Sequence, residues 1–418
     1  MSKKLNILII THHNVFPVDS GAAMTTMSYI EEMQNWHNLS VVVTHPYVPS
    51  AEDLIRLKTK WPKVTLYCSE GGNQSSHSGF MSKVRSLMYK TGLLQAPVYT
   101  LTETAQYYYA PLKPDEAETI QKALAATSYD IIEVNYVEKF PAIFLLPEST
   151  IKVAVNHEPR FRRTMVQNQG GLLEKNYGTY LEKYQYKLEN DLMDLYDAVI
   201  CLNKEDTDLV GNSISKPVYQ APVSASWEDI CEINDLERPV EHVFFLGSGN
   251  HHPNFDAVEW YRESLGRSVY EKLGVKLEVI GDWPQEKQKQ LESPYLNFIG
   301  FVDDLNVYAE NSIMLVPVRT GGGIRTKIQW AMSKGIPVVS TAFGHEGIPC
   351  IHENSVMQAE DTEAFVSGIK RLLDDVSLRN KIRREANLIM REHFSPKTVV
   401  DSRSKIYSEL LTQKLVLE

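Results

Sequence analysis

The chain has 418 residues, of which 43% are hydrophobic and 23% are charged, and its formal net charge is −10. This length exceeds the usual size of one domain, so the sequence predicts at least two domains, each with its own core. The composition is that of an ordinary globular protein, and the acidic balance argues against nucleic acid as a partner, because a basic face supplies most of the affinity for nucleic acids.

The chain begins with an apolar run, Leu5 to Ile10, that is too short for the hydrophobic region of a signal peptide, so we interpret it as a buried first strand. No stretch reaches the about 20 apolar residues that a membrane span needs. The four cysteines form no CxxC pair, which indicates neither a zinc site nor a disulfide framework. We therefore expect the protein in the cytoplasm, where it could also lie at the inner face of the membrane. We expect no metal site.

Short β-branched runs alternate with helical patterns along the first half of the chain, which is typical of a doubly wound parallel sheet. One helical pattern, residues 114–127, has Pro114 at its first position and acidic residues near the positive end of the helix dipole. The predicted strands of this half are 5–10, 39–45, 64–68, 130–134, 151–155 and 197–202.

A polar stretch near 215–238, interrupted by prolines, predicts a linker, and a second series of strands follows at 242–247, 276–281, 296–300, 313–317, 336–340 and 355–359. The sequence thus predicts an α/β protein with two Rossmann-like domains, residues 1–215 and 238–394, facing each other across a cleft. Residues 395–418 form a predicted helical segment that we expect to pack back toward the N-terminal domain.

Three glycine loops fall at strand ends, which is where open α/β sheets bind ligands. One is VDSGAA, which contains Gly21, another is the SGN loop at 248–250, and the third is RTGGG, which ends at Gly323. The glycines of the third loop let backbone N–H groups approach a ligand closely, and the helix that follows offers unpaired donors to an anion.

Arg325 and Lys327 follow these glycines, where a helix begins and its dipole disfavours cations unless an anion is present. We therefore predict a phosphate or diphosphate site in this loop. The alternative is a glycine-rich surface loop with two solvated bases.

The segment GGGIRTKIQWAMSKGIPVVSTAFGHEGI, residues 321–348, resembles the donor-binding segment of glycosyltransferase family 4, whose members have the GT-B fold. The resemblance extends over FLGSGNHHPNFDAVEW at 245–260 and over 296–318. It covers the N-terminal half more weakly, through FPVDSGAAMTT after the first strand, VNHEP at 155–159 and the helix and strand at 184–210.

This resemblance implies transfer of a sugar from a nucleotide-diphosphate sugar, of the UDP or GDP type, to a glycan, lipid-linked or protein acceptor. It also implies retention of the anomeric configuration and chemistry without a metal or another cofactor. The acceptor would bind to the N-terminal domain and the donor to the C-terminal domain. The donor-binding residues that it implies are Ser248, Gly249, Asn250, Phe301, Val302, Gly321, Gly322, Gly323, Ile324, Arg325, Thr326, Lys327, Trp330 and Glu346.

The sequence departs from the family pattern at two positions that usually hold glutamates. Gly322 stands where one of them reads the transferred sugar, and Trp330 stands where the other binds the ribose. Tryptophan cannot accept hydrogen bonds from ribose hydroxyls, although it can stack or pack there. We expect the carboxylate of Glu346 to compensate for the missing glutamates.

His157 directly follows a predicted strand, and the resemblance implies that it acts near the reacting centre, where a neutral imidazole can donate to a sugar hydroxyl. A histidine that caps the strand end is the alternative. Gly21 is implied to approach the donor sugar, and it also fits a plain turn at a helix start. His12 and His13 lie at another strand end and are expected on the acceptor side.

Two basic stretches complete the predicted site. Arg160, Arg162 and Arg163 follow His157 and are expected to hold an anionic acceptor such as a lipid diphosphate. Residues 78–100 mix basic and apolar residues at helical spacing, which fits either peripheral contact with an anionic membrane or an ordinary amphipathic helix packed on its own domain.

The sequence therefore predicts a GT-B glycosyltransferase. A non-catalytic relative that binds sugars or stabilises a partner is the rival hypothesis, because the ribose glutamate is lost. A sugar-nucleotide epimerase is a third, and it fits the C-terminal motif less well.

Overall fold

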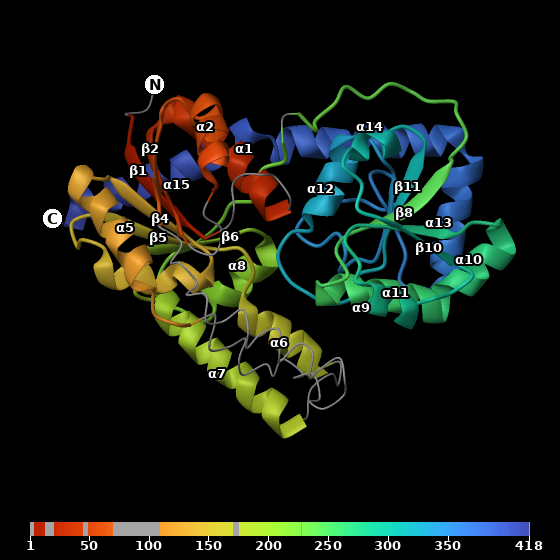
Figure 1. Cartoon of the computed structure of the whole chain (residues 1–418), viewed down its shortest axis with the longest axis horizontal. Coiled ribbons are helices and arrows are strands. Elements are labelled where there is room, and N and C mark those ends of the chain that lie inside the picture. The colour runs from red at the N-terminus through yellow and green to blue at the C-terminus, as the bar shows by residue number, and fades with distance from the viewer. Residues whose placement is uncertain are drawn as a thin grey trace.

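The computed structural model describes residues 4–12, 21–44, 49–69, 109–169, 175–226 and 228–417. It contains two sheets, each covered by helices, that form two bodies side by side (Figure 1). The elements of the first body are β1 (Asn6–Thr11), α1 (Gly21–Trp36), β2 (Asn38–Val43), α2 (Ala51–Lys60), β3 (Val64–Cys68), α5 (Pro114–Ala126), β4 (Ile131–Asn135), η1 (Val137–Leu145), β5 (Ile151–Asn156), α6 (Arg160–Gln169), α7 (Lys175–Met193), β6 (Ala198–Cys201), α8 (Lys204–Gly211) and β7 (Val218–Gln220).

The second half of the chain begins at β8 and ends with the long C-terminal helix α15. Its elements are β8 (His242–Leu246), α9 (His252–Trp260), η2 (Tyr261–Leu265), α10 (Gly266–Leu273), β9 (Leu277–Ile280), α11 (Gln285–Gln290), β10 (Leu296–Gly300), η3 (Leu305–Tyr308), β11 (Ser312–Val316), α12 (Thr326–Ser333), β12 (Val338–Ser340), β13 (Met357–Gln358), α13 (Thr362–Asp374), α14 (Val376–His393) and α15 (Pro396–Leu417).

All strands in both sheets pair in parallel. The first sheet has the order β3-β2-β1-β4-β5-β6-β7 and the second has the order β10-β9-β8-β11-β12-β13. The strand order reverses between β1 and β4 and again between β8 and β11, and such reversals open a crevice at the carboxyl ends of the strands. The predicted pair of doubly wound parallel sheets is confirmed.

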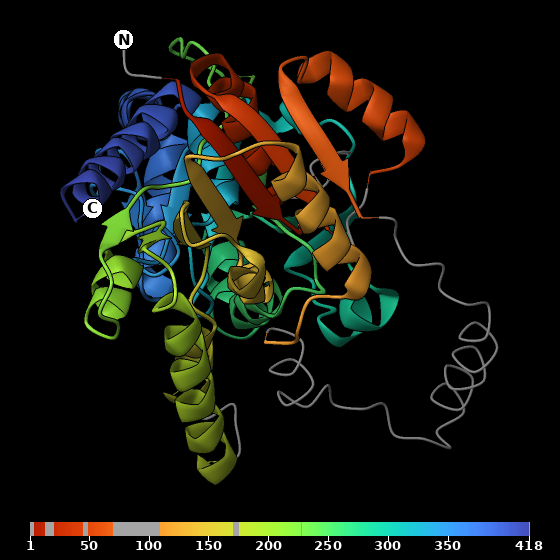
Figure 2. The same cartoon turned by 90° about the vertical axis from the view of Figure 1, so that its left-hand side faces the viewer.

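The central strands of the first sheet are apolar on both faces because helices cover both sides. Residues at alternate positions divide accordingly: Ile7, Ile9 and Val153 pack toward α1, whereas Leu8 and Ala154 pack toward α5 and η1. Figure 2 shows this sheet, with α5 across it and α7 projecting away from it. This packing on both faces fixes the carboxyl ends of the strands and so positions the loops that follow them.

One short strand lies where the sequence predicted only linker. β7 pairs with β6 at the edge of the first sheet, through Val218 opposite Val199 and Tyr219 opposite Ile200. It was missed because three residues next to two prolines carry almost no periodic signal.

The C-terminal helix α15 leaves the second body and lies along the first one, next to α1 (Figures 1 and 2). Tyr407 and Arg403 of α15 are buried against Glu133 of β4. Near the end of the helix, Lys414 donates to the carbonyl of Ser149 over 2.6 Å. The chain therefore crosses between the two bodies twice, once through the segment after β7 and once through α15.

Candidate active site

The glycine loop before α12 touches the first body directly. A Cβ placed on Gly21, the first residue of α1, would lie 1.9 Å from Oγ1 of Thr326, and one on Gly323 would lie 2.5 Å from the carbonyl oxygen of His157. The backbone of Gly323 has φ of 65°, in the left-handed region that favours glycine. The loop thus brings together Gly21, His157 and Thr326, which the sequence predicted for one site.

Arg325 lies at the N-cap position of α12 and is only 9% exposed. Its Nη1 donates to the carbonyl of Gly323, and its guanidinium lies over the ring of Phe343 at 4.6 Å. Its Nη2 is buried and has no hydrogen-bond partner among the residues that the structure describes. Burial lowers the pKa of Arg325, although the nearby carboxylates of Glu346 and Glu158 oppose this shift.

Lys327 lies in the first turn of α12, beside Arg325. Its Nζ donates to Oδ1 of Asn254 over 2.6 Å and lies over the ring of Phe245, 4.2 Å from the centroid. Burial, and then the nearby guanidinium, lower the pKa of Lys327 to about 7. Two cations thus stand together at a helix N-terminus, and neither forms an ion pair within the described part of the chain.

Asn254 of α9 connects the loop after β8 with Lys327. This side chain donates from Nδ2 to the carbonyl of Ser248 over 2.9 Å while its Oδ1 accepts from Lys327. Gly249 is buried, and a Cβ on it would lie 2.5 Å from the ring of Trp283. The SGN loop is therefore linked to Lys327 through Ser248 and Asn254, and its role in donor binding stays a prediction. Asn254, which follows Pro253 at the start of α9, was not among the predicted site residues.

On the opposite side, His157 follows β5, and Asn135 and Tyr136 are among the neighbours that hold it. Its Nε2 lies 2.9 Å from Oδ1 of Asn135, and its ring stacks on Tyr136 with 3.8 Å between centroids and 13° between planes. Tyr136 has φ of 71°, a conformation that non-glycine residues rarely adopt and that clusters at functional sites. His12 meets the edge of the same tyrosine at 4.9 Å, and burial lowers the pKa of His12 to about 3, so it is neutral.

The predicted basic stretch on α6 is mostly paired. Arg160 contacts Glu138 at 2.9 Å and Glu158 at 2.8 Å. Arg162 contacts Asp206 of α8 and also Glu346 of the second body, so it joins the two bodies. Arg163 is half-buried and forms no ion pair with the residues that the structure covers.

Glu158 is a carboxylate that sequence reasoning missed. A Cβ on Gly322 would lie 2.6 Å from Cγ and 2.9 Å from Oε1 of Glu158. Glu158 therefore occupies the space next to the glycine that replaces the family glutamate, whereas Glu346 is bound to Arg162. Burial raises the pKa of Glu158, but Arg160, Arg163 and Arg325 outweigh it, and the net pKa is lowered.

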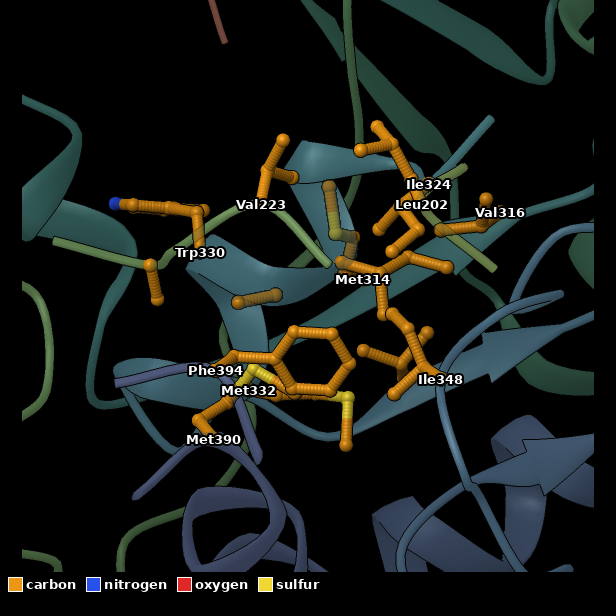
Figure 3. Packing of buried hydrophobic residues seen from close by; sticks show 14 of the residues in the cluster. Leu202, Val223, Met314, Val316, Ile324, Trp330, Met332, Ile348, Met390 and Phe394 are labelled. Carbon is orange, nitrogen blue, oxygen red and sulfur yellow. The ribbon is translucent and has the colours of Figure 1, made fainter. Parts of the chain in front are cut away.

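Trp330 is 7% exposed and belongs to the core of the second body. Its ring meets that of Phe244 edge-on at 6.4 Å, and Figure 3 shows it beside Val223, within the same apolar cluster as Met314. Ile324 is buried in that cluster as well. Phe301, by contrast, is 69% exposed after β10, and Val302 packs against the core.

Two predicted features fall outside the described residues: His13 and the basic, apolar segment 78–100. Within the described residues, no helix is long and apolar enough to cross a membrane. The same residues contain no group of three or more histidine, cysteine or acidic side chains that could hold a metal ion.

Comparison with known proteins finds a family model that matches part of the chain. Residues 241–375 match the family model described as Glycosyl transferases group 1. A Klebsiella pneumoniae protein described as an uncharacterized 44.6 kDa protein in the cps region is 23% identical over 259 residues, which make up 59% of this chain. The chain thus spans only 65% of the length of the curated relative that it matches.

Solved structures match nearly the whole chain at low identity. Sucrose-phosphate synthase from Thermosynechococcus elongatus has a TM-score of 0.68 and 15% identity, and the match covers 98% of this chain and 100% of that one. A variant of S. aureus TarM, solved with Fondaparinux, alpha-GlcNAc-glycerol and UDP, has a TM-score of 0.61 and 11% identity, and the match covers 96% of this chain and 99% of that one. Anabaena HepE, solved with UDP and glucose, has a TM-score of 0.58 and 13% identity, and the match covers 97% of this chain and 100% of that one. These likenesses confirm the predicted fold.

Proposed function

We propose that this chain, which has the GT-B fold and carries a glycosyl transferases group 1 domain at residues 241–375, transfers a sugar from a nucleotide-diphosphate sugar to an acceptor. One observation carries the proposal: Arg325 and Lys327 are placed together at the start of α12, neither forms an ion pair with the described residues, and Nη2 of Arg325 is buried and unbonded. A buried cation is costly unless it is paired, so this pair is suited to an anionic ligand.

The diphosphate of a sugar nucleotide fits this place chemically. As the sugar leaves, negative charge develops on the diphosphate, and fixed donors aimed at that charge lower the barrier without rearranging. The N–H groups at the start of α12 and the two cations are such donors. We propose that they take over the role that a divalent ion has in other transferases, and that the reaction proceeds with retention, as the family resemblance implies.

We assign the sugar side of the donor to the surface around His157, Glu158 and Gly21, which contact the glycine loop from the first body. The acceptor, a glycan, lipid-linked or protein molecule, would then enter from the N-terminal domain. UDP is the nucleotide that we favour, because HepE and TarM were solved with it. We place the reaction in the cytoplasm, where fractionation of cells would reveal any fraction at the inner face of the membrane.

Trp330 supports a second candidate, a non-catalytic GT-B relative. Its burial in the core means that the position offers no carboxylate and no exposed ring to a ribose. A subunit that has lost donor binding would keep this packing. The cationic pair at Arg325 is the argument against that candidate, because a protein without an anionic ligand gains nothing from the buried charges.

A thermal-shift titration with nucleoside diphosphates and nucleotide sugars, without metal, separates the two. A ligand that binds only the folded protein stabilises it by about 2.7 kcal/mol when its free concentration is about 100 times Kd. A rise in Tm that is selective for one sugar nucleotide, followed by its hydrolysis or transfer, is the expected result. No shift with any of them would favour the non-catalytic subunit, and interconversion of the donor sugar without an acceptor would identify an epimerase.

A further inference from the structure

A buried chain of hydrogen bonds runs from α15 through β4 to His157. It begins at Glu133, in the middle of β4, which has no exposed surface. One oxygen of this carboxylate, Oε2, accepts from the hydroxyls of Tyr29, at 3.0 Å, and Tyr407, and it lies 3.1 Å from Nη1 of Arg403. The other oxygen, Oε1, accepts from Nδ2 of Asn135 over 2.8 Å.

This arrangement fixes which way the amide of Asn135 points. A carboxylate only accepts hydrogen bonds, so the amide must turn its NH2 group toward Glu133 and its Oδ1 toward His157. The opposite orientation would place Oδ1 against a carboxylate oxygen. Since Oδ1 also only accepts, Nε2 of His157, at 2.9 Å, must carry the hydrogen.

The sequence builds this chain through strand geometry. Glu133 and Asn135 are two residues apart on β4, so their side chains leave the same face of the sheet. Asn135 pairs with Val155 of β5, and His157 follows two residues later, which makes it the diagonal neighbour on that face. The turn at Tyr136 then brings the next ring onto the imidazole, where it fixes the ring plane.

We propose that Glu133 and Asn135 are positioning residues for His157 and hold its imidazole in the Nε2–H tautomer. The inference rests on the proposed function in taking His157 as a residue of the transfer site. Its chemical consequence is a correction to the expectation that the ring donates to a sugar hydroxyl. With Nε2–H committed to Asn135, any hydrogen bond that a hydroxyl makes to Nδ1 has the hydroxyl as donor.

Glu133→Gln tests the proposal with an isosteric change. The hydroxyls of Tyr29 and Tyr407 donate to one side, where the guanidinium of Arg403 also forms its ion pair, so the single amide oxygen of glutamine must stay there and its NH2 must face Asn135. Asn135 then flips, presents its own NH2 to Nε2, and turns His157 into the Nδ1–H tautomer. Nitrogen NMR of protein with labelled histidine reads this directly, because protonated and unprotonated ring nitrogens have well-separated shifts, and His157→Ala assigns the signals.

The wild-type protein should show Nε2–H, and Glu133→Gln should show Nδ1–H, at a pH where the ring is neutral. Glu189→Gln is the matched control, because Glu189 is equally buried and holds Asn156 of β5 over 2.8 Å in the same manner without contacting His157. It should leave the tautomer unchanged. A wild-type Nδ1–H tautomer, or a Glu133→Gln spectrum with Nε2–H retained, would overturn the proposal, and the first of these needs no variant to fold.

Kinetics separate this inference from the proposed function. If the chain is a transferase, Glu133→Gln should lower kcat at least tenfold, within the usual range for a misplaced acid or base, and leave Kd for the nucleoside diphosphate unchanged. An unchanged kcat alongside an inverted tautomer would overturn the positioning role. If no donor is turned over by the wild type, the proposed function fails, whereas the tautomer measurement still decides how His157 is held.

Discussion

Two groups of cations lie near the contact between the two bodies, and they differ in what balances their charge. Arg160 and Arg162, on α6, each contact two carboxylates. Arg325 and Lys327, at the start of α12, contact a carbonyl, an amide oxygen and two aromatic rings, and form no ion pair in the described part of the chain. Because burying a charge without an ion pair is costly, we propose that the second group binds an anionic ligand, whereas the ion pairs of the first group connect parts of the structure.

Sequence alone does not separate these groups. HEPRFRRTM and GGGIRTK both place basic residues just after a strand, and the sequence predicts an anionic partner for both. One of the carboxylates that neutralise α6, Glu158, lies in the same stretch, but the others come from η1, α8 and the loop after β12, which are more distant in sequence. Whether a basic stretch binds a ligand therefore depends on what the fold brings beside it.

The largest expected effect comes from removing the two cations at the start of α12. Replacing both Arg325 and Lys327 with Ala should weaken binding of a nucleoside diphosphate by about 10² to 10⁴, since each charge-assisted hydrogen bond contributes about 1.5–3 kcal/mol. Isothermal titration calorimetry measures the change. Arg319→Ala is the matched control, because Arg319 lies in the same loop but is paired with Asp256 at 2.7 Å. Equal affinity of the double variant and the wild type would remove the phosphate site from this loop.

The C-terminal part of this site could be predicted from the sequence because its residues are contiguous. Strand, glycine loop and helix follow one another within 312–333, so their order alone places Arg325 and Lys327 at a helix N-terminus. The direction of each side chain could not be predicted in the same way. Trp330 lies on the same helix, yet whether it faced the cleft or the core depended on how α12 packs, and it faces the core.

The N-terminal part is assembled by topology, and less of it was predictable. His157 was found because it ends a strand, whereas Asn135 and Glu133 lie on the neighbouring strand, and pairing of the strands is needed to bring them together. One signal was available: an acidic residue in the middle of an otherwise apolar strand is rarely left without a partner. Its partner, Arg403, lies on α15, 270 residues further along, and no local pattern indicates that contact.

A smaller effect should distinguish the arginines of α6 from one another. Arg162→Ala leaves Asp206 and Glu346 without their common partner, and we expect a loss of about 2–3 kcal/mol in the free energy of unfolding, somewhat below the value for a fully buried pair because Arg162 keeps 13% of its side chain exposed. Denaturant unfolding followed by fluorescence measures it. Arg163→Ala, on the same helix, should change this free energy by at most about 0.5 kcal/mol. Similar losses in both variants would contradict a structural role specific to Arg162.

The smallest effect concerns how ligand affinity depends on pH through Lys327. The pKa of Lys327 is lowered to about 7 in the free protein, so above that pH the amine is mostly neutral. A bound diphosphate stabilises the charged amine and raises its pKa, so binding must take up a proton when the pH lies between the two values. Affinity for the nucleoside diphosphate should therefore fall as the pH rises above about 7, by up to tenfold per pH unit. Calorimetry in buffers of different ionisation enthalpy measures the proton uptake.

The same group contributes to folding with the opposite sign. A lysine whose pKa is below its unfolded value binds fewer protons when folded, so its contribution to stability increases as the pH rises from about 7 and is least favourable below that. Ligand affinity and this part of the stability should thus change in opposite directions over one pH range. Lys327→Arg keeps the charge at every pH and should abolish both trends. An unchanged pH dependence in that variant would mean that the ligand itself, and not Lys327, takes up the proton.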